Sequence, residues 1–448
     1  MQLSFHGSAR EVTGACFRLK TEHTSILVDC GLFQGGKEFE DMNLEPFPFD
    51  ARGIDAVFVT HAHIDHIGRL PRLMRAGFSG VIYSTPPTKE MAALLLEDAK
   101  NLACRRENKG GEEQLCNAEE VDNVMRCWQT IPYLKNVSVG EMTMRLHNAG
   151  HILGSAFVEV VCEDKRIYFT GDLGNVPSVL LPPPDMIKDA DYLVIESTYG
   201  NRMHESAEER VLKLERAVED AASRRGVLMI PAFATERTQD LLYLLNEMSY
   251  FKRIPEIPVF VDSPLAIRMT RIFAEYVGHY RDEIKKIYQE HPNIFKFKKL
   301  RLTETIEESK KINDVPAPKV IISGSGMMNG GRILHHLRRY LPDPKSMLLV
   351  VGFQSAGSLG RRLIDGQKIV KMFGEDVAVE AEIRKINGFS AHADNPQLMS
   401  FVAAGRDTLK KVFVVHGEEG AALHLASQIR DHIGIPAVSP VLHEEVEI

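Results

Sequence analysis

The segment HAHIDH, from His61 to His66, constrains this chain more than any other part of the sequence. It places three imidazoles and one carboxylate within six residues, directly after the apolar run Ala56-Val57-Phe58-Val59. Alternate residues of an extended segment point to the same side, so His61 and His63 can hold one zinc ion. Asp65 and His66 follow where the chain turns into a helix, and they face a different point. The spacing therefore favours two adjacent ions, bound where strands end.

A site for two ions needs more ligands than one loop supplies, and such residues end other predicted strands. Six of the 17 histidines stand at strand ends or in glycine-flanked loops, and the remaining eleven are expected to be solvent-facing or structural. The downstream candidates, with one aspartate that precedes the HAHIDH segment, are Asp29, His151, Asp172, His392 and His416.

The whole-chain properties exclude several classes of protein. A length of 448 residues predicts two domains, and 44% hydrophobic with 26% charged residues is ordinary for a globular protein. No secretion signal and no membrane-spanning window are visible, which predicts a cytoplasmic protein without a membrane partner. The net charge of −7 argues against coating nucleic acid by bulk electrostatics, although it does not exclude a nuclease.

The six cysteines are scattered and form no CxxC pair, as is typical of a reducing compartment. The spacing of Cys104, Cys116 and Cys127 fits no zinc-finger pattern, so free thiols are the favoured interpretation.

The order of the predicted helices and strands divides the chain into two parts. Up to residue 200, short strands alternate with helices, with strands over 3–20 and 25–30, helices over 66–75 and 89–107, and a hairpin of 158–162 with 166–170. Beyond Glu196, helices over 205–224, 236–249, 264–277 and 332–340 alternate with strands over 227–230, 257–261, 319–322 and 346–350. This βα alternation predicts a parallel sheet in an inserted domain. A further strand over 379–386 leads back to the first domain.

The ordered set Asp29, HAHIDH, His151 and Asp172 resembles the metallo-β-lactamase superfamily. Glu196, His392 and His416 resemble three further motifs of its β-CASP branch, which processes nucleic acids. The segments GSAREVTG (7–14), PAFA (231–234) and SGSGMM (323–328) extend the resemblance over essentially the whole chain. It implies an α/β protein of the compact prokaryotic type: a metallo-β-lactamase αββα sandwich from residues 1–200 and 385–448, with a β-CASP α/β domain inserted over 201–384.

The resemblance also implies a role for each site residue. One zinc ion would be bound by His61, His63 and His151. A second zinc ion would be bound by Asp65, His66 and His416, and Asp172 would bridge the two ions. Asp29 would orient a ligand histidine, and it counts with Asp65 among the catalytic residues. A hydroxide activated by the two Zn²⁺ ions would attack the phosphodiester. His392, aligned and kept charged by Glu196, would act as the general acid for the leaving 3′-oxygen.

The inserted domain carries the predicted substrate-side residues. Ser323, Gly324, Ser325 and Gly326 open a glycine-rich loop whose backbone N–H groups, at a helix N-terminus, can hold a phosphate. Arg237 and Gln354 resemble further substrate-side elements, although Thr235-Glu236 stands where relatives often have Val-Gly. The basic segments 296–301 and 332–339 are either solvated faces or RNA contacts. Trp128, Phe295 and Phe297 could stack bases, but buried packing is favoured.

The predicted function is a zinc-dependent ribonuclease that hydrolyses single-stranded RNA. A histidine at position 416 suggests RNA, because DNA-processing relatives tend to carry an apolar residue there. One alternative is a hydrolase of small thioesters or lactams, which would not need the inserted domain. Another is a non-catalytic RNA-binding subunit, which the complete ligand set disfavours. Endonucleolytic or 5′-to-3′ exonucleolytic cleavage, DNA cleavage and a homodimer are left open.

Overall fold

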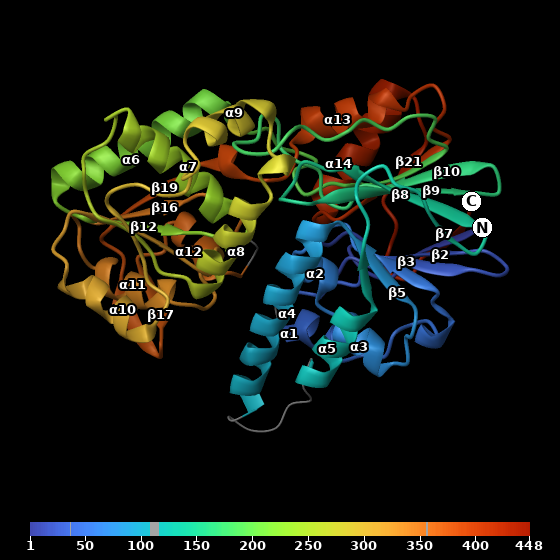
Figure 1. Cartoon of the computed structure of the whole chain (residues 1–448), viewed down its shortest axis with the longest axis horizontal. Coiled ribbons are helices and arrows are strands. Elements are labelled where there is room, and N and C mark those ends of the chain that lie inside the picture. The colour runs from blue at the N-terminus through green and yellow to red at the C-terminus, as the bar shows by residue number, and fades with distance from the viewer. Residues whose placement is uncertain (36, 108–115, 355–356) are drawn as a thin grey trace. The chain divides into compact units, whose positions relative to one another are not determined.

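The computed structural model describes residues 1–35, 37–107, 116–354 and 357–448 (Figure 1). Ser355, the neighbour of the predicted substrate-side residue Gln354, lies outside the described part, as does the side chain of Cys104. The chain divides into two compact units. The first unit comprises Met1–Met203 and Ala391–Ile448, and the inserted unit comprises His204–Ser390.

Two seven-stranded sheets form the first unit. In spatial order, the first sheet contains β22 (Glu445–Glu447), β1 (Gln2–Phe5), β2 (Phe17–Lys20), β3 (Ser25–Val28), β4 (Ala56–Phe58), β5 (Val81–Ser84) and β6 (Trp128–Thr130). The second contains β21 (Ala437–Val438), β20 (Lys411–Val415), β11 (Tyr192–Glu196), β10 (Lys165–Phe169), β9 (Ala156–Cys162), β8 (Met142–Asn148) and β7 (Val137–Val139). Because β1 pairs antiparallel with β22, the two chain ends meet in one sheet, as Figure 1 shows.

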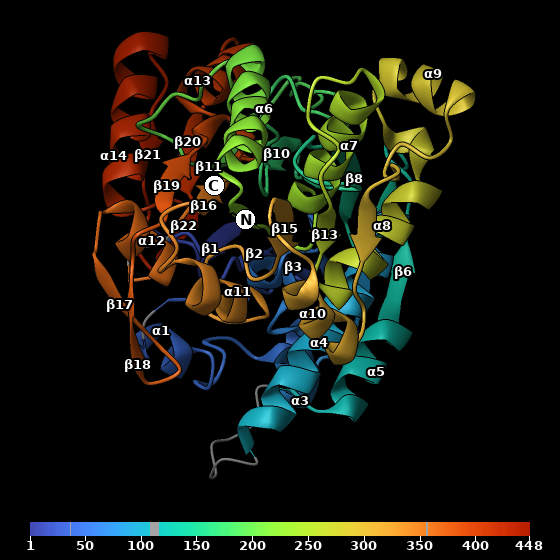
Figure 2. The same cartoon turned by 90° about the vertical axis from the view of Figure 1, so that its left-hand side faces the viewer.

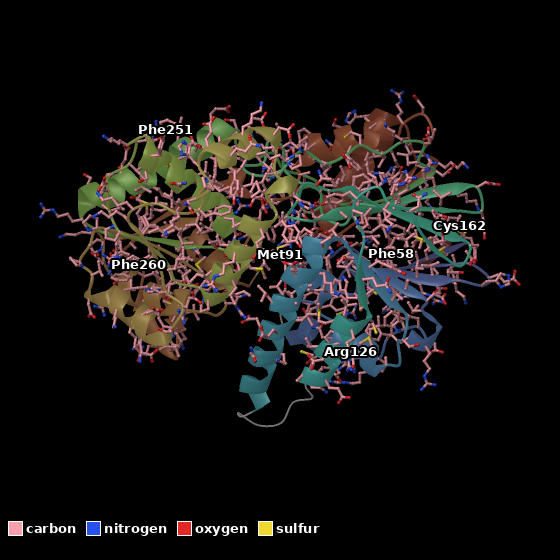
Figure 3. All side chains as sticks on the ribbon, viewed as in Figure 1. Phe58, Met91, Arg126, Cys162, Phe251 and Phe260 are labelled. Atoms are coloured by element: carbon pink, nitrogen blue, oxygen red, sulfur yellow. The ribbon has the colours of Figure 1, made fainter. Side chains whose placement is uncertain are left out.

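The core of the first unit lies between its two sheets. Strand residues alternate between the two faces: Phe413 and Val415 of β20 belong to the inter-sheet core, whereas Val412 and Val414 face the other side. Phe58 of β4 contributes to the same inter-sheet core and is labelled in Figure 3.

Helices cover the outer faces of both sheets. On the second sheet, α13 (Asn395–Ala404) and α14 (Glu419–Gln428) pack through Phe401 and Leu425 against Val412 and Val414. The first sheet is accompanied by α1 (Lys37–Met42), α2 (Ile64–Ile67), α3 (Leu70–Arg75), α4 (Pro86–Glu107) and α5 (Ala118–Cys127) (Figure 1). The predicted αββα sandwich is confirmed.

Two local predictions in this unit are wrong. The expected strand over 3–20 is interrupted, because β1 ends at Phe5 and β2 begins at Phe17. Ser8 and Arg10 between them have φ of 50° and 61°, which no continuous strand accommodates. The expected helix over 66–75 is two short helices that break at Gly68 and Arg69. The hairpin of β9 and β10 is confirmed.

The inserted unit contains a six-stranded sheet in which every pair is parallel, as predicted. Its spatial order is β14 (Leu300–Leu302), β13 (Val259–Val261), β15 (Lys319–Ser323), β12 (Val227–Pro231), β16 (Met347–Val350) and β19 (Glu382–Lys385). Strand β19 is shorter than the expected segment 379–386. A separate hairpin joins β17 (Ile369–Met372) to β18 (Glu375–Ala378).

Seven α-helices among the described residues accompany this sheet, and all are labelled in Figure 2. They are α6 (Ala207–Arg224), α7 (Arg237–Tyr250), α8 (Pro264–Glu275), α9 (Asp282–Glu290), α10 (Ile306–Lys311), α11 (Ile333–Tyr340) and α12 (Leu359–Ile364). Leu337 of α11 and Leu363 of α12 pack against Met229 and Leu348 of the sheet, and Figure 1 shows α6 on the opposite side of the strands. Among the described residues, no helix combines the length and apolarity needed to cross a membrane.

Candidate active site

Strand direction brings the predicted metal ligands of the first unit to one place. Strands β10, β11 and β20 are parallel neighbours, so Asp172, Glu196 and His416 follow or end them at the same edge of the second sheet. In the first sheet, β3 and β4 are also parallel, which places Asp29 beside the start of the HAHIDH segment. Parallel strands thus gather residues that are far apart in the sequence.

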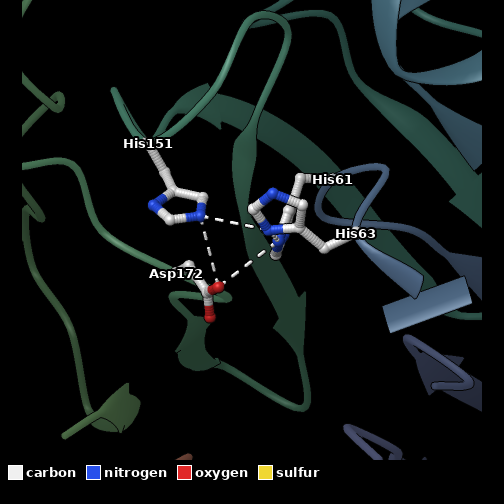
Figure 4. Close-up of side chains that lie close together, drawn as sticks. All are labelled: His61, His63, His151 and Asp172. Carbon is white, nitrogen blue, oxygen red and sulfur yellow. Dashed lines mark hydrogen bonds and ion pairs between the residues drawn. The ribbon is translucent and has the colours of Figure 1, made fainter. Parts of the chain in front are cut away.

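The first ligand group contains His61, His63, His151 and Asp172 (Figure 4). The distance from Nε2 of His61 to Nδ1 of His63 is 2.9 Å, and that from Nε2 of His151 to the same Nδ1 is 3.3 Å. Oδ2 of Asp172 lies 3.3 Å from Nε2 of His61 and 3.4 Å from Nε2 of His151. A tetrahedral zinc ion with bonds of about 2.0 Å separates its ligand atoms by about 3.3 Å, so these four atoms have the required spacing.

The second ligand group contains Asp65, His66 and His416. Oδ1 of Asp172 lies 3.4 Å from Nε2 of His66 and 3.4 Å from Nε2 of His416. One carboxylate oxygen of Asp172 therefore faces the first group and the other faces the second, as in a carboxylate that bridges two cations.

Buried atoms without partners support a cation at this position. Within the described residues, neither Nε2 of His66 nor Oδ1 of Asp172 has a hydrogen-bond partner, although both side chains are almost fully buried. Such an arrangement is costly for polar atoms unless something else compensates them. A metal ion between the two atoms would do so, and the residues present fit it.

The charge states of His63, His416 and Asp172 also suit metal binding. Burial lowers the pKa of His63 and of His416 to about 3, so both imidazoles are neutral and keep a lone pair for a metal. At Asp172, burial opposes ionisation, but the neighbouring His416, His66 and His61 outweigh it and hold the pKa well below its ordinary value.

Asp29 fixes the orientation of two residues of the HAHIDH loop. Its carboxylate is fully buried; Oδ1 accepts a hydrogen bond from the Thr60 backbone N–H at 2.8 Å, and Oδ2 accepts one from the Thr60 hydroxyl at 2.8 Å. Nδ1 of His66 lies 2.7 Å from Oδ2. Since Nδ1 of His66 is held by Asp29, its Nε2 is the atom left for a ligand.

Thr60 defines the tautomer of His61 in the same way. Its hydroxyl proton goes to Asp29, so the contact of 3.1 Å between Oγ1 of Thr60 and Nδ1 of His61 has the ring N–H as donor. Nε2 of His61 then carries the free lone pair. The sequence prediction missed Thr60, although its position directly before the first histidine was a usable signal.

His392 and Glu196 form a carboxylate–histidine pair beside Asp172. Nδ1 of His392 lies 3.2 and 3.1 Å from the two carboxylate oxygens of Glu196, which is fully buried. Glu196 also accepts a hydrogen bond from the Leu173 N–H at 2.6 Å. Burial disfavours a charged His392, but Glu196, Asp172 and Asp65 outweigh burial and raise its pKa to about 9. This imidazole is protonated at neutral pH and can donate a proton.

The predicted substrate-side residues lie in the inserted unit, where they make internal contacts. Arg237 is buried, forms an ion pair of 2.9 Å with Asp240, and places its guanidinium 5.5 Å from the centre of the Phe389 ring. Gln354 is buried and donates to the Gly326 carbonyl at 3.0 Å. A substrate role for these residues stays a prediction.

Several polar groups of the glycine-rich loop form hydrogen bonds within the inserted unit. Ser323 donates its hydroxyl to the Asp262 carbonyl, and the Ser325 N–H binds the Gly330 carbonyl at 3.3 Å. The Gly324 carbonyl accepts from the N–H of Ile333, the first residue of α11. Trp128 is buried and donates its indole N–H to Ser84, in line with the favoured packing role.

Three families match consecutive parts of the chain. Residues 9–225 match the metallo-beta-lactamase superfamily, residues 238–363 the Beta-Casp domain, and residues 376–440 the Zn-dependent metallo-hydrolase RNA specificity domain. These matches imply bound metal ions, which agrees with the ligand groups described above.

Individual relatives agree with these matches. Ribonuclease TTHA0252 of Thermus thermophilus is 36% identical over 95% of this chain and 95% of its own length. Transcription termination factor FttA of Methanosarcina mazei is 33% identical over 94% of this chain and 68% of its own length. A crystal structure of a protein of unknown function from Enterococcus faecalis shares the fold, with a TM-score of 0.56, 14% identity and coverage of 100% of this chain and 99% of that chain. The chain therefore belongs to the β-CASP branch of the metallo-β-lactamase superfamily.

Proposed function

We propose that this protein is a zinc-dependent ribonuclease that hydrolyses phosphodiester bonds of single-stranded RNA. Membership of the family supports a hydrolase that acts on nucleic acid, and a relative that covers nearly the whole chain is named a ribonuclease. The match to an RNA specificity domain over residues 376–440 favours RNA as the substrate. The observation that carries the proposal is Asp172, whose two oxygens face two separate ligand groups.

In this proposal, His61, His63 and His151 would hold the first Zn²⁺ ion, and Asp65, His66 and His416 would hold the second. Asp172, which lies between the two ligand groups, would be a ligand common to both. When bound, the ions supply Lewis acidity that neutralises the phosphate charge and lowers the pKa of water toward about 7.

The protein's own residues then handle protons and orientation. Asp29 and Thr60 hold His66 and His61 with Nε2 directed inward, so the ligands need little rearrangement on binding. His392 donates its proton to the 3′-oxygen as the bond from phosphorus to that oxygen breaks. Glu196 keeps the imidazole charged and aligned for this step. The products are a 3′-hydroxyl and a 5′-phosphate.

Other parts of the account stay predictions. They are RNA contacts by the glycine-rich loop and by Arg237 and Gln354, and a cytoplasmic location.

The test combines metal content with cleavage of end-labelled single-stranded RNA by wild type, His392→Ala and a control. His424→Ala is a matched control because His424 is exposed on α14. We expect zinc in all three proteins, cleavage by wild type and His424→Ala, and a loss of about 100-fold or more for His392→Ala. Zinc-replete wild type that cleaves neither RNA nor DNA would refute the nuclease proposal, and an active His392→Ala would refute the acid role.

A further inference from the structure

The loop between β1 and β2 contacts both chain segments that supply the second ligand group. This loop contains the GSAREVTG segment, which the proposed chemistry does not use. The Ser8 carbonyl accepts from the His416 N–H at 2.7 Å, and the Glu11 carbonyl accepts from the Gly417 N–H at 3.1 Å. At its other end, the Ala15 N–H donates to the Asp65 carbonyl at 2.9 Å. The loop thus ties His416, near the chain's end, to Asp65.

Ser8 also contacts the His416 ring. Its Oγ lies 3.0 Å from Nδ1 of His416 and 3.0 Å from the Thr13 carbonyl, and Ser8 is fully buried. A hydroxyl has one proton, and a carbonyl can only accept. The Ser8 proton therefore goes to Thr13, and the hydroxyl oxygen accepts from the ring N–H at Nδ1. This assignment leaves the lone pair of His416 on Nε2, the atom that lies 3.4 Å from Asp172.

We infer that Ser8 is a positioning residue that holds His416 in the tautomer and orientation needed to bind the second metal ion. The inference rests on the proposed function, because it assigns the second ion to His416. Thr60 makes the same kind of contact with His61. Its hydroxyl donates its proton to Asp29 and accepts from the Nδ1–H of His61, which leaves the lone pair of that ring on Nε2. Both Ser8 and His416 have left-handed backbones, with φ of 50° and 47°, a conformation that residues other than glycine rarely adopt.

A metal-affinity comparison separates this role from general loss of structure. Ser8→Ala removes the hydroxyl, and Ser8→Gly removes it while adopting positive φ without strain. Ser138→Ala is the matched control, because Ser138 is an exposed serine of β7 in the same unit. We measure zinc bound per chain against a series of buffered free-zinc concentrations.

We expect both Ser8 variants to bind the first ion as wild type does and the second ion about 10- to 100-fold more weakly, with Ser138→Ala unchanged. Wild-type affinity for the second ion in either Ser8 variant would overturn the inference. Wild type that binds fewer than two ions would instead refute the two-ion proposal, so the two failures are distinguishable.

The second readout needs no metal. In metal-free protein labelled with ¹⁵N-histidine, the two ring nitrogens report which one carries the proton, and the His416 signals are assigned by their loss in His416→Gln. We expect a protonated Nδ1 in wild type and in Ser138→Ala, and a mixture of tautomers in Ser8→Ala and Ser8→Gly. A protonated Nε2 in wild type, or an unchanged tautomer in both Ser8 variants, would overturn the inference.

Discussion

Replacing Glu196 by glutamine should change how the activity depends on pH. The Glu196→Gln side chain has the same shape and stays next to Nδ1 of His392, but it lacks the negative charge that lies 3.1 Å away in wild type. Burial, which disfavours a charged imidazole, is unaffected by the change. Among the groups that raise the pKa of His392, Glu196 has the largest effect.

The size of the effect follows from this balance. With Glu196 in place, the pKa of His392 is about 9, so the imidazole is almost fully protonated at neutral pH. Without that charge we expect the pKa to fall to its ordinary value of about 6.5 or lower. Near pH 7.5 only about one tenth of the variant would then hold the proton, which predicts a rate about tenfold lower than wild type. Near pH 5.5 both proteins hold it, and their rates should be nearly equal.

The assay is the ratio of wild-type to variant kcat on one RNA substrate across this pH range. The effect of metal loss on the two rates at low pH cancels in this ratio, since both proteins have the same metal ligands. Glu159→Gln is a matched control, because Glu159 is a buried carboxylate 2.7 Å from Nε2 of His147. Its ratio should stay flat with pH. A ratio for Glu196→Gln that is also independent of pH would refute the reasoning.

Three further changes test other parts of the account. Asp29→Asn removes the carboxylate that holds His66 and should weaken binding of the second zinc ion about 10- to 100-fold; unchanged zinc titration would contradict this. Removing metal with a chelator should abolish RNA cleavage and added zinc should restore it, whereas cleavage by metal-free protein would exclude a metal-dependent reaction. Burial, and then His443, Arg18 and Arg69, lower the pKa of His6 to about 4. Between pH 6.5 and 4 the unfolded chain therefore takes up a proton that the folded protein does not. The free energy of unfolding should decrease by up to about 3 kcal/mol as the pH is lowered through this range. His6→Phe should lose less stability in urea unfolding between pH 7 and 5, and an equal loss in both proteins would contradict the role of His6.

Local sequence patterns were sufficient to predict much of the fold. Apolar runs that end in Asp or His predicted the strands that precede Asp29, Asp172 and His416. This was possible because the apolar run and the polar residue that follows it lie within a few neighbouring positions. The βα alternation after Glu196 predicted the parallel sheet of the inserted unit, since buried parallel strands are short continuous apolar runs. The structure brings the predicted metal ligands together, and their roles stay predictions.

Contacts between distant residues could not be predicted from one sequence. Ser8 and His416 are separated by 408 positions, and nothing in either residue type indicates that they meet. The break between β1 and β2 depends on left-handed backbones at Ser8 and Arg10, conformations that neither residue type signals. The position of the Arg237 guanidinium 5.5 Å from the centre of the Phe389 ring likewise depends on tertiary packing, because the two residues lie far apart in the sequence.

Cleavage of single-stranded RNA in water enriched in oxygen-18 tests the central claim most directly. Hydrolysis with departure of the 3′-oxygen, as proposed for this site, places the heavy oxygen in a 5′-phosphate and leaves a 3′-hydroxyl on the other fragment. Mass spectrometry of the fragments from zinc-loaded wild type should show this pattern, and Asp172→Asn should not produce it above background. Fragments that end in 2′,3′-cyclic phosphate, or 5′-phosphates without the heavy oxygen, would contradict the account.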